Sequence, residues 1–558
     1  MAFSFLPQVG DKVALLLLGP VIPPCAGLLG PLLFCGGLDG RGGVDILGSF
    51  NSRARNSRFT GFSPRVPPKN TQRAMEELTV GLTFDDVLLV PQHSDILPAD
   101  VQLTTRFSRN TPINVPFASA AMDTVTEWKL AVALAREGGI GIIHRNLDLE
   151  GQTREVDKVK RSANGVILDP LTLPPDASVE EARIIMRSQN ISGFPIVQGG
   201  KVVGILTRRD LSFHGDDATP VSAVMTVSGL VTAPVGTSLD EARVILNENK
   251  VEKLIILDDA GQLAGLITMK DLNMLADYPQ SARDDRGRLR VGAAIGVRDF
   301  ERAEALVEAG VDVLVVDTAH GHTSNVENTL RDLKQSFDVD VVAGNIATAA
   351  AARALVDAGA DGVKVGIGPG SICTTRVVAG VGVPQFSAVR NVAEELAGSG
   401  VPVIADGGIR YSGDVVKALA AGASCVMLGS LFAGLDESPG ETVLYKGRSF
   451  KSVRGMGSIG AMQRGSKERY RQGHVQEADK LVPEGVEGMV PFKGRLSDFV
   501  YQMCGGVRSG MGYCGSETIQ DLWERAQFVR VTSSGQRESH PHDVVITKES
   551  SNYAHRDE

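Results

Sequence analysis

Eight short apolar segments rich in β-branched residues recur along the chain, and they constrain its fold more than any other feature. They occupy residues 113–122, 139–145, 291–297, 311–320, 339–347, 361–368, 401–409 and 423–430. Apolar strands this continuous are typical of parallel sheets that are buried on both faces. Segments with helical periodicity, such as 299–310 and 348–359, fill the intervals. The pattern predicts an α/β fold, a (β/α)8 TIM barrel, with an open doubly wound sheet as the alternative.

An internal repeat interrupts this rhythm after the second apolar segment. Residues 176–210 and 236–271 share one order of features: a helix N-cap, a helix, two strands joined by a turn, and a closing T-x-x-D. Ser178 and Ser238 stand where the two N-caps belong, and acidic residues follow each of them. Paired units of this kind usually bury each other's apolar faces.

The two units resemble a tandem pair of CBS domains. The resemblance implies that the T-x-x-D residues face the ribose of an adenosine or guanosine nucleotide such as ATP or GTP; these residues are Thr207, Asp210, Thr268 and Asp271. A purely structural pair that binds nothing is the alternative.

The repeat divides the chain into a barrel in two parts and an insert. We expect the barrel in residues 75–163 and 281–558, and the CBS pair in 164–280, with halves at about 164–226 and 227–280.

Residues 1–74 stand apart from this organisation. Their apolar stretch at 13–35 is broken by prolines and glycines, which argues against a membrane-spanning helix. The stretch also lacks the basic start of a secretory signal. We expect a disordered or spurious extension, because patterned sequence begins after Met75; a targeting segment is the less favoured alternative.

Charge and cysteine content exclude several classes of protein. The net charge is −9, and Lys and Arg are spread along the chain, so no surface for nucleic acid is expected. The six cysteines show neither metal-ligand spacing nor a disulfide framework. This favours a soluble protein of the reducing cytoplasm.

Glycine-rich turns follow the last three predicted strands. The sixth strand runs into GIGPGSICTTR at 366–376, the seventh ends in Asp406-Gly407-Gly408, and the eighth ends in Gly429-Ser430. Glycines allow the backbone to turn tightly and approach a ligand, and consecutive N–H groups can hold an anion, with the Ser371 hydroxyl beside them. Together the three turns predict a phosphate site at the carboxyl end of the barrel.

Cys373 lies inside the first of these turns. A cysteine near backbone N–H dipoles becomes a good nucleophile. The alternative is a small buried residue, which is the usual state of a cysteine, but the flanking glycines and Thr374-Thr375 favour the nucleophile.

Polar residues also end the fourth and fifth strands, at Asp317 and at Gly344-Asn345. Asp317 can bind ribose hydroxyls, or it can simply cap a helix. After the eighth strand, the long polar segment 436–490 carries Arg469-Tyr470. Long excursions at a barrel mouth are usually functional lids, and a solvated basic loop is the alternative.

These segments together resemble bacterial-type inosine-5′-monophosphate (IMP) dehydrogenase, from about Leu82 to about Tyr553. The matching motifs are LTFDDVLLVP (82–91), AAMDTVTE (120–127), GIGPGSICTTR (366–376), IADGGIR (404–410), VRGMGS (453–458) and ITKES (546–550). The resemblance implies NAD-dependent oxidation of IMP to xanthosine 5′-monophosphate (XMP), in guanine nucleotide biosynthesis. It also implies a homotetramer that can pair into an octamer, and a mobile flap at about 436–490.

The resemblance assigns roles to particular residues. Cys373 attacks the purine, while Arg469, Tyr470 and Thr375 activate water. IMP is held by Ser371, Asp406, Gly407, Gly408, Gly429, Ser430, Met122, Met456, Gly457 and Glu484. NAD contacts Asp317, Thr318, Ala319, Asn345, Gly366 and Gly368. Potassium binds Gly368, Gly370 and Cys373, together with Glu538, Ser539 and His540 of a neighbouring subunit.

Two departures and two rivals accompany this resemblance. The family commonly has a phosphate-binding tyrosine where this chain has Val453, and residues 1–74 lie outside the family pattern. GMP reductase, a similar barrel with a cysteine loop, is the nearest rival, although it normally lacks the Arg-Tyr lid and Glu484. A nucleotide sensor with an inactive barrel is the second rival, which the repeats alone would support.

Overall fold

The computed structural model describes residues 78–553, except 163–166, 168, 169, 190, 213, 549 and 551. The extension predicted for residues 1–74 lies outside the described residues.

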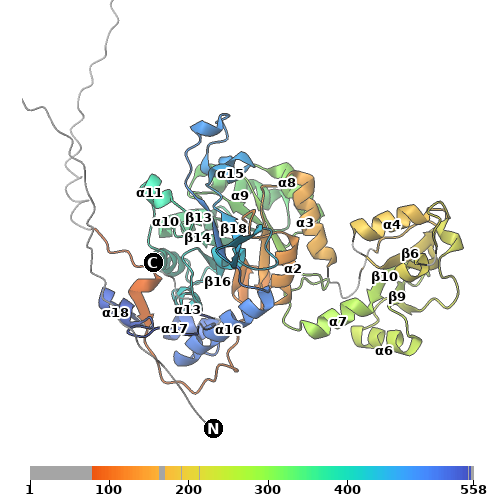
Figure 1. The fold of residues 1–558 in the computed structure, drawn as a ribbon, viewed down its shortest axis with the longest axis horizontal. Coiled ribbons are helices and arrows are strands. Elements are labelled where there is room, and N and C mark those ends of the chain that lie inside the picture. Colours follow the sequence, from red (N-terminus) through yellow and green to blue (C-terminus); the bar gives the residue numbers. More distant parts are fainter. Residues whose placement is uncertain are drawn as a thin grey trace, which may run out of the picture. The chain divides into compact units, whose positions relative to one another are not determined.

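Within the described residues, eight parallel strands form a closed barrel in the order β11-β12-β13-β14-β15-β16-β4-β5 (Figure 1). The strands are β4 (Phe117–Ser119), β5 (Ile140–Ile143), β11 (Val291–Ile295), β12 (Val313–Asp317), β13 (Asp340–Ile346), β14 (Gly362–Val365), β15 (Val403–Asp406) and β16 (Cys425–Leu428). The barrel predicted from the apolar segments is confirmed, and the open sheet is excluded because β16 pairs with β4.

A helix follows each strand and packs outside the barrel. These helices are α2 (Trp128–Arg136), α3 (Leu149–Arg161), α8 (Phe300–Glu308), α9 (Ser324–Ser336), α10 (Ala349–Asp357), α12 (Gln385–Glu395), α13 (Ser412–Ala420) and α16 (Leu496–Tyr513). Threonine side chains cap α9 and α10: Thr323 accepts from the amide of Val326, and Thr348 from that of Ala351. The last helix, α16, contacts both α13 and α2 and so completes the ring.

Alternate residues of the strands face opposite sides of the barrel wall. Val313 and Val315 of β12 belong to the apolar cluster inside the barrel, whereas Leu314 and Val316 belong to the cluster shared with the helices. Both clusters are buried, which is why the strands read as continuous apolar segments rather than as an alternating pattern.

A β-hairpin closes the amino-terminal end of the barrel. Its strands are β2 (Thr105–Ser108) and β3 (Thr111–Ile113), and its Phe107 and Ile113 side chains join the interior cluster. Ser108 and Asn110 bind the Asp340 carboxylate at the start of β13. Ligands can therefore reach the interior only from the carboxyl ends of the strands.

The insert between β5 and β11 contains two similar units. The first has α4 (Val179–Ser188), β6 (Gly193–Gln198), β7 (Lys201–Thr207) and α5 (Arg208–Leu211), and the second has β8 (Thr232–Pro234), α6 (Leu239–Asn249), β9 (Lys253–Leu257), β10 (Leu263–Thr268) and α7 (Met269–Asp277). Each unit buries its own apolar cluster.

The predicted N-caps of the insert are confirmed, because Ser178 and Ser238 accept hydrogen bonds from the amides of Glu181 and Glu241. The closing T-x-x-D residues also cap helices. Both the amide and the hydroxyl of Thr207 donate hydrogen bonds to Asp210 Oδ2.

The long polar segment after the barrel carries a sheet of its own. Its antiparallel strands are β17 (Thr442–Tyr445), β18 (Arg448–Arg454) and β19 (Glu487–Pro491). Between β18 and β19 lie α15 (Ile459–Gln463) and the short 3-10 helices η3 (Ser466–Tyr470) and η4 (Ala478–Lys480). We call residues 455–486 the flap; it is the part of the predicted 436–490 segment that reaches the site described below.

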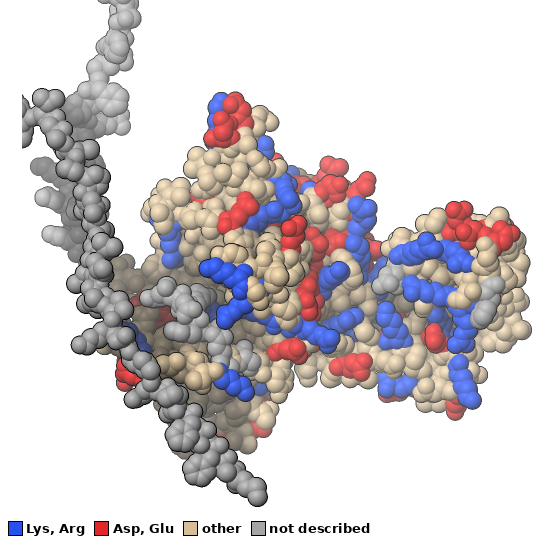
Figure 2. Space-filling model, in the orientation of Figure 1, with Lys and Arg blue, Asp and Glu red and all other residues tan. Residues whose placement is uncertain are grey.

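Charged side chains of both signs occur on the surface of the barrel (Figure 2). On the face drawn in Figure 2, basic and acidic side chains are interspersed over the barrel. Across the described part of the chain, every helix is too short or too polar to span a lipid bilayer.

Candidate active site

A cavity opens at the carboxyl ends of the barrel strands, under the flap. Many residues that the sequence predicted for the site line it: Met122, Asp317, Ala319, Asn345, Gly366, Gly368, Gly370, Cys373, Thr375, Asp406, Gly407, Met456, Gly457, Arg469, Tyr470 and Glu484. They come from separate strands and from the flap, so the fold brings together residues that are distant in the sequence. Ligand sites of TIM barrels lie at this end.

Cys373 stands at the rim of this cavity with its side chain partly exposed. Its amide donates to the carbonyl of Gly370 (3.0 Å), which folds the turn back on itself. Its Sγ lies 3.3 Å from Thr375 Oγ1, and that hydroxyl donates to Glu484 Oε2 (2.7 Å). The chain from thiol to hydroxyl to carboxylate gives a proton a path away from the sulfur.

The other described cysteines lie in a different environment. Cys425, Cys504 and Cys514 are buried, and burial raises the pKa of the Cys425 thiol and raises that of Cys504 to about 12. These thiols stay protonated near neutral pH and are poor nucleophiles. Among the cysteines of the described residues, only Cys373 is not buried.

Asp406 presents one carboxylate oxygen to the cavity. Asn345 Nδ2 and Lys364 Nζ both contact its Oδ2, at 2.9 and 2.7 Å. Within the described residues no hydrogen bond reaches Oδ1, so its lone pairs are left for a ligand hydroxyl. Gly366 fits closely against this residue: with φ +156°, a Cβ there would lie 2.1 Å from the Asp406 carbonyl oxygen. Only glycine allows this approach of the two strand ends.

Lys364 is a residue of the site that the sequence analysis missed. It lies on β14, it is 2% exposed, and its Nζ contacts Asp317 Oδ1 (3.0 Å), Asp406 Oδ2 (2.7 Å) and Asn345 Oδ1. The signal in the sequence was a single charged residue in the apolar strand GVKV. A buried charge is rare unless it is paired.

The flap brings Arg469 into the cavity. Its guanidinium forms an ion pair with Asp317 Oδ2, and its carbonyl accepts from the amide of Ala319 (3.2 Å). Arg145 pairs with Glu468 (3.3 Å), and Ser466 donates to the Met456 carbonyl. The contacts of Arg469 with Asp317 and Ala319 and that of Glu468 with Arg145 hold the flap against the barrel, while the Ser466–Met456 bond lies within the flap.

Burial lowers the pKa of the Arg469 guanidinium, and the nearby Arg145 acts in the same direction, while contact with Tyr470 opposes them. Burial raises the pKa of the Tyr470 hydroxyl, and Cys373 and Glu484 add to this, while Arg469 opposes it. Burial thus favours the neutral form of Arg469, while its ion pair with Asp317 favours the charged form.

A second cavity adjoins the first, and six residues line both: Ala319, Ile367, Thr375, Arg469, Tyr470 and Glu484. It also contains Thr318 and the capping residues Thr323 and Thr348, which open α9 and α10. The amides of a first helical turn lack partners within the helix and suit phosphate oxygens. The N-terminal ends of two helices therefore line this cavity.

Several predicted residues do not line the central cavity. Ser371, Gly408, Gly429 and Ser430 lie in its neighbouring turns, and Gly429 is next to Met122, since a Cβ there would be 3.2 Å from the Met122 sulfur. Glu538 closes α18 (Ser533–Glu538), and Ser539 and His540 follow it. Their predicted role is in a neighbouring subunit, so it stays a prediction.

Val453 is buried in β18, where it is paired with Gly488 of β19. Its apolar side chain adds no hydrogen-bonding group to the cavity, although Gly455 and Met456 just beyond it do line the site. Any phosphate contact must therefore come from other residues.

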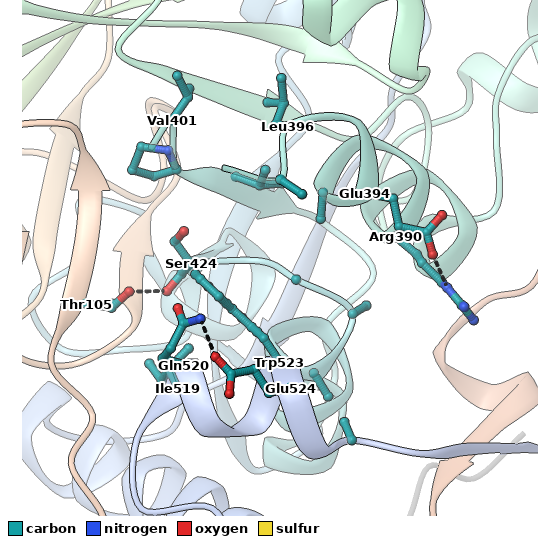
Figure 3. A pocket seen from close by; sticks show the side chains of 18 of the residues that line it. Thr105, Arg390, Glu394, Leu396, Val401, Ser424, Ile519, Gln520, Trp523 and Glu524 are labelled. Carbon is teal, nitrogen blue, oxygen red and sulfur yellow. Dashed lines mark hydrogen bonds and ion pairs between the residues drawn. The ribbon is translucent and has the colours of Figure 1, made fainter. Parts of the chain in front are cut away.

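A third cavity lies at the opposite end of the barrel (Figure 3). It is lined at the starts of β15 and β16 by Pro402 and Ser424, and by Trp523 of α17 (Ile519–Arg525). Thr105 of the closing hairpin donates to the Ser424 carbonyl there (2.8 Å). Because Cys373 and the two aspartates lie at the other end, this cavity is not the reactive site.

Comparison with known proteins agrees with this geometry. The model of the "IMP dehydrogenase / GMP reductase domain" matches residues 81–542. The chain belongs to the IMP dehydrogenase / GMP reductase family. The resemblance stated from the sequence, and with it the expectation of an oxidoreductase of this family, is confirmed.

Curated relatives in the family match this chain over most of its length. The inosine-5′-monophosphate dehydrogenase of Rhodopirellula baltica is 54% identical over 516 residues, which covers 90% of this chain and 96% of the relative. The enzyme of the same name from Aquifex aeolicus is 56% identical and covers 86% and 98%. Among solved structures, a cysteine-to-alanine variant of GMP reductase from Trypanosoma brucei, in complex with guanosine 5′-monophosphate, superposes with a TM-score of 0.77. It is 44% identical and covers 85% of this chain and all of the other.

Proposed function

We propose that this member of the family is an IMP dehydrogenase, which oxidises IMP to XMP with NAD and water in guanine nucleotide biosynthesis. The observation that carries the proposal is the position of Arg469 and Tyr470 of the flap, which line the same cavity as Cys373. A site that both attacks a purine and hydrolyses the product needs such a second set of groups. The identity of 54–57% to curated IMP dehydrogenases supports the assignment.

The chemistry balances around one carbon atom. The sulfur of Cys373 bonds to C2 of the hypoxanthine ring, and the hydrogen on C2 leaves with its electron pair as a hydride. NAD, when bound, supplies the acceptor of that hydride. A thioimidate between sulfur and C2 remains; water adds to C2, the C–S bond breaks, and the thiol regains a proton as XMP leaves.

IMP would be held at both of its ends. Asp406 Oδ1 would accept from the ribose hydroxyls, since its Oδ2 is already engaged. The phosphate would lie among Ser371, Gly407, Gly408, Gly429 and Ser430, where the turns offer backbone amides. Met122 and Met456 would contact the base and Gly457 and Glu484 its polar edge, which leaves C2 facing Cys373.

NAD would lie across the two adjoining cavities. Asp317, Thr318, Ala319, Asn345, Gly366 and Gly368 would surround its reactive half, and the openings of α9 and α10 would receive its diphosphate. Potassium would bind the carbonyls of Gly368, Gly370 and Cys373, because hard cations prefer oxygen ligands.

The flap would supply the hydrolytic step. Arg469 forms an ion pair with Asp317, which is proposed to contact NAD. The flap and the cofactor would therefore occupy the same space at different stages of the reaction. With its pKa lowered by burial, Arg469 could accept a proton from water. The Thr375–Glu484 hydrogen bond would take up the proton from the cysteine side.

GMP reductase is the second candidate, and the similarity to the Trypanosoma brucei structure is what favours it. The experiment is to supply the purified chain with IMP and NAD, or with GMP and NADPH, and to follow absorbance at the nicotinamide band. NADH formed only in the presence of IMP supports the dehydrogenase. NADPH consumed with GMP supports the reductase, and binding of ATP or GTP without turnover supports the inactive sensor.

The covalent step has its own test. Cys373→Ala should abolish turnover, by at least about 10⁴-fold, and should leave IMP binding measurable by calorimetry. The matched variant Cys504→Ala, at a buried cysteine, should retain turnover. NADH formation at the wild-type rate in Cys373→Ala would refute the covalent route.

Three further assignments belong to the proposal. We propose that ATP or GTP binds the repeats at their T-x-x-D residues, that the chain assembles as a homotetramer which can pair into an octamer, and that it works in the cytoplasm. The supporting observation for the repeats is their shared cap–helix–strand order.

A further inference from the structure

A buried ammonium group lies between the two carboxylates of the site. Lys364 projects from β14, while Asp406 ends the adjacent strand β15 and Asp317 ends β12, on the far side of β13. Lys364 Nζ donates hydrogen bonds to Asp406 Oδ2 and Asn345 Oδ1, and it forms an ion pair with Asp317 Oδ1 at 3.0 Å. A side chain that is 2% exposed has no room for solvent to replace any of them.

The carboxylates of Asp406 and Asp317 have different roles in the proposed function. Asp406 offers its free oxygen toward the IMP ribose, and Asp317 lies where NAD and Arg469 alternate. When the flap lifts, Asp317 loses Arg469 but keeps Lys364. Without the lysine, two carboxylates would face one another across the strand ends with no cation fixed in the barrel, and buried like charges repel strongly.

From these contacts we infer that Lys364 is a positioning residue that serves both ligands at once. It fixes the orientation of Asp406 for IMP and of Asp317 for NAD, and it does so in both positions of the flap. The inference rests on the proposed function for the identity of the two ligands, but the contacts themselves do not. Its consequence is that a change at Lys364 must weaken the binding of IMP and of NAD together.

The test uses the full chain carrying Cys373→Ala, so that both ligands can be titrated without reaction. IMP is titrated calorimetrically into the protein alone, and NAD into the protein saturated with IMP. We expect Lys364→Met to raise both dissociation constants by about tenfold or more, since each carboxylate loses a charged partner. Lys364→Arg keeps the positive charge but replaces the compact ammonium with a planar guanidinium. It should therefore raise both dissociation constants by a smaller factor.

Lys160 provides a matched control. It is also 2% exposed, and its Nζ contacts two carboxylates, Asp284 (3.0 Å) and Asp312 (2.6 Å). These lie near the amino-terminal ends of β11 and β12, far from the cavity. Lys160→Met should lower the melting temperature as Lys364→Met does, and it should leave both dissociation constants unchanged.

The outcomes separate the inference from the proposed function. If neither constant changes in the Lys364 variants, or if only one of them does, the inference is overturned. If Lys364→Met does not fold, Lys364→Arg alone decides by the same criterion. Turnover is measured separately, on the chain with Cys373 intact: failure to form NADH from IMP counts against the dehydrogenase, whereas the titrations still judge Lys364.

Discussion

Arg469 shows how one residue can be prepared for an uncommon role. An arginine in water is protonated at any physiological pH. Here the side chain is removed from water and placed near Arg145, and both effects favour the neutral form. Asp317 and Tyr470 favour the charged form, so the balance depends on where the flap is.

This balance predicts a pH dependence. Below the lowered pKa, the neutral fraction of Arg469 grows about tenfold for each pH unit. Hydrolysis should therefore accelerate from about pH 7 to about pH 9, while the hydride step, which needs no neutral arginine, should not follow this slope. Stopped-flow measurement of the NADH burst and of the steady-state rate separates the two steps.

Arg469→Ala provides the matching variant. It should keep the burst of NADH and slow hydrolysis by about 10²–10⁴-fold, and it should lose the alkaline acceleration. An equal loss in the burst and in the steady state would contradict the role assigned to this residue.

Single residues also differ in how visible they are in a sequence. Cys373 could be predicted because glycines and threonines flank it, and Asp317 and Asp406 because they end apolar strands. Lys364 could not, because a lysine within a strand does not reveal its partners. They lie on the strands β12, β13 and β15, which come beside β14 only when the parallel sheet forms.

At the scale of elements, α16 depends on close packing against α13. Gly510 of α16 lies against Val416 of α13, and a Cβ at that glycine would lie 2.7 Å from a Val416 methyl carbon. Gly505 of the same helix has open space in this position. The two glycines offer a direct comparison within one helix.

Gly510→Leu should push α16 away from α13 and lower the free energy of unfolding by about 1–3 kcal/mol. Gly505→Leu adds the same side chain in open space and should not destabilise the fold, because leucine favours helix more than glycine does. Thermal denaturation of the two variants gives the comparison. Equal melting temperatures would show that α16 does not need this contact.

The strands and helices of the barrel could be predicted because burial on both faces leaves a plain apolar signal. The sheet of β17, β18 and β19 could not. Two of its three strands, β17 and β19, are largely exposed, so no buried apolar pattern marks them, and the segment looks like a polar lid. The hairpin that closes the barrel was missed for a related reason, because exposed residues stand among the buried ones in its two short strands.

At the scale of the whole molecule, the insert enters and leaves the barrel through one connection, between β5 and β11. No strand of the insert takes part in the closed barrel within the described residues. The site residues all lie on other segments. The insert therefore supplies no group to the described site.

Removal of residues 165–280 tests this separation. With a short linker in their place, the chain should keep turnover within about threefold, as surface connections are tolerant of change in length, and should lose any response to ATP or GTP. A loss of turnover in a folded deletion variant would show that the repeats support catalysis directly.

The pairing of β4 with β16 has a consequence for biosynthesis. Phe117 emerges from the ribosome early, and its partner Val426 is added only when most of the polypeptide has been made. Until then one edge of β4 has backbone N–H and C=O groups without hydrogen-bond partners. Such an edge is the kind of surface that chaperones bind or that leads to aggregation. The nascent enzyme thus has to protect an open sheet during most of its translation.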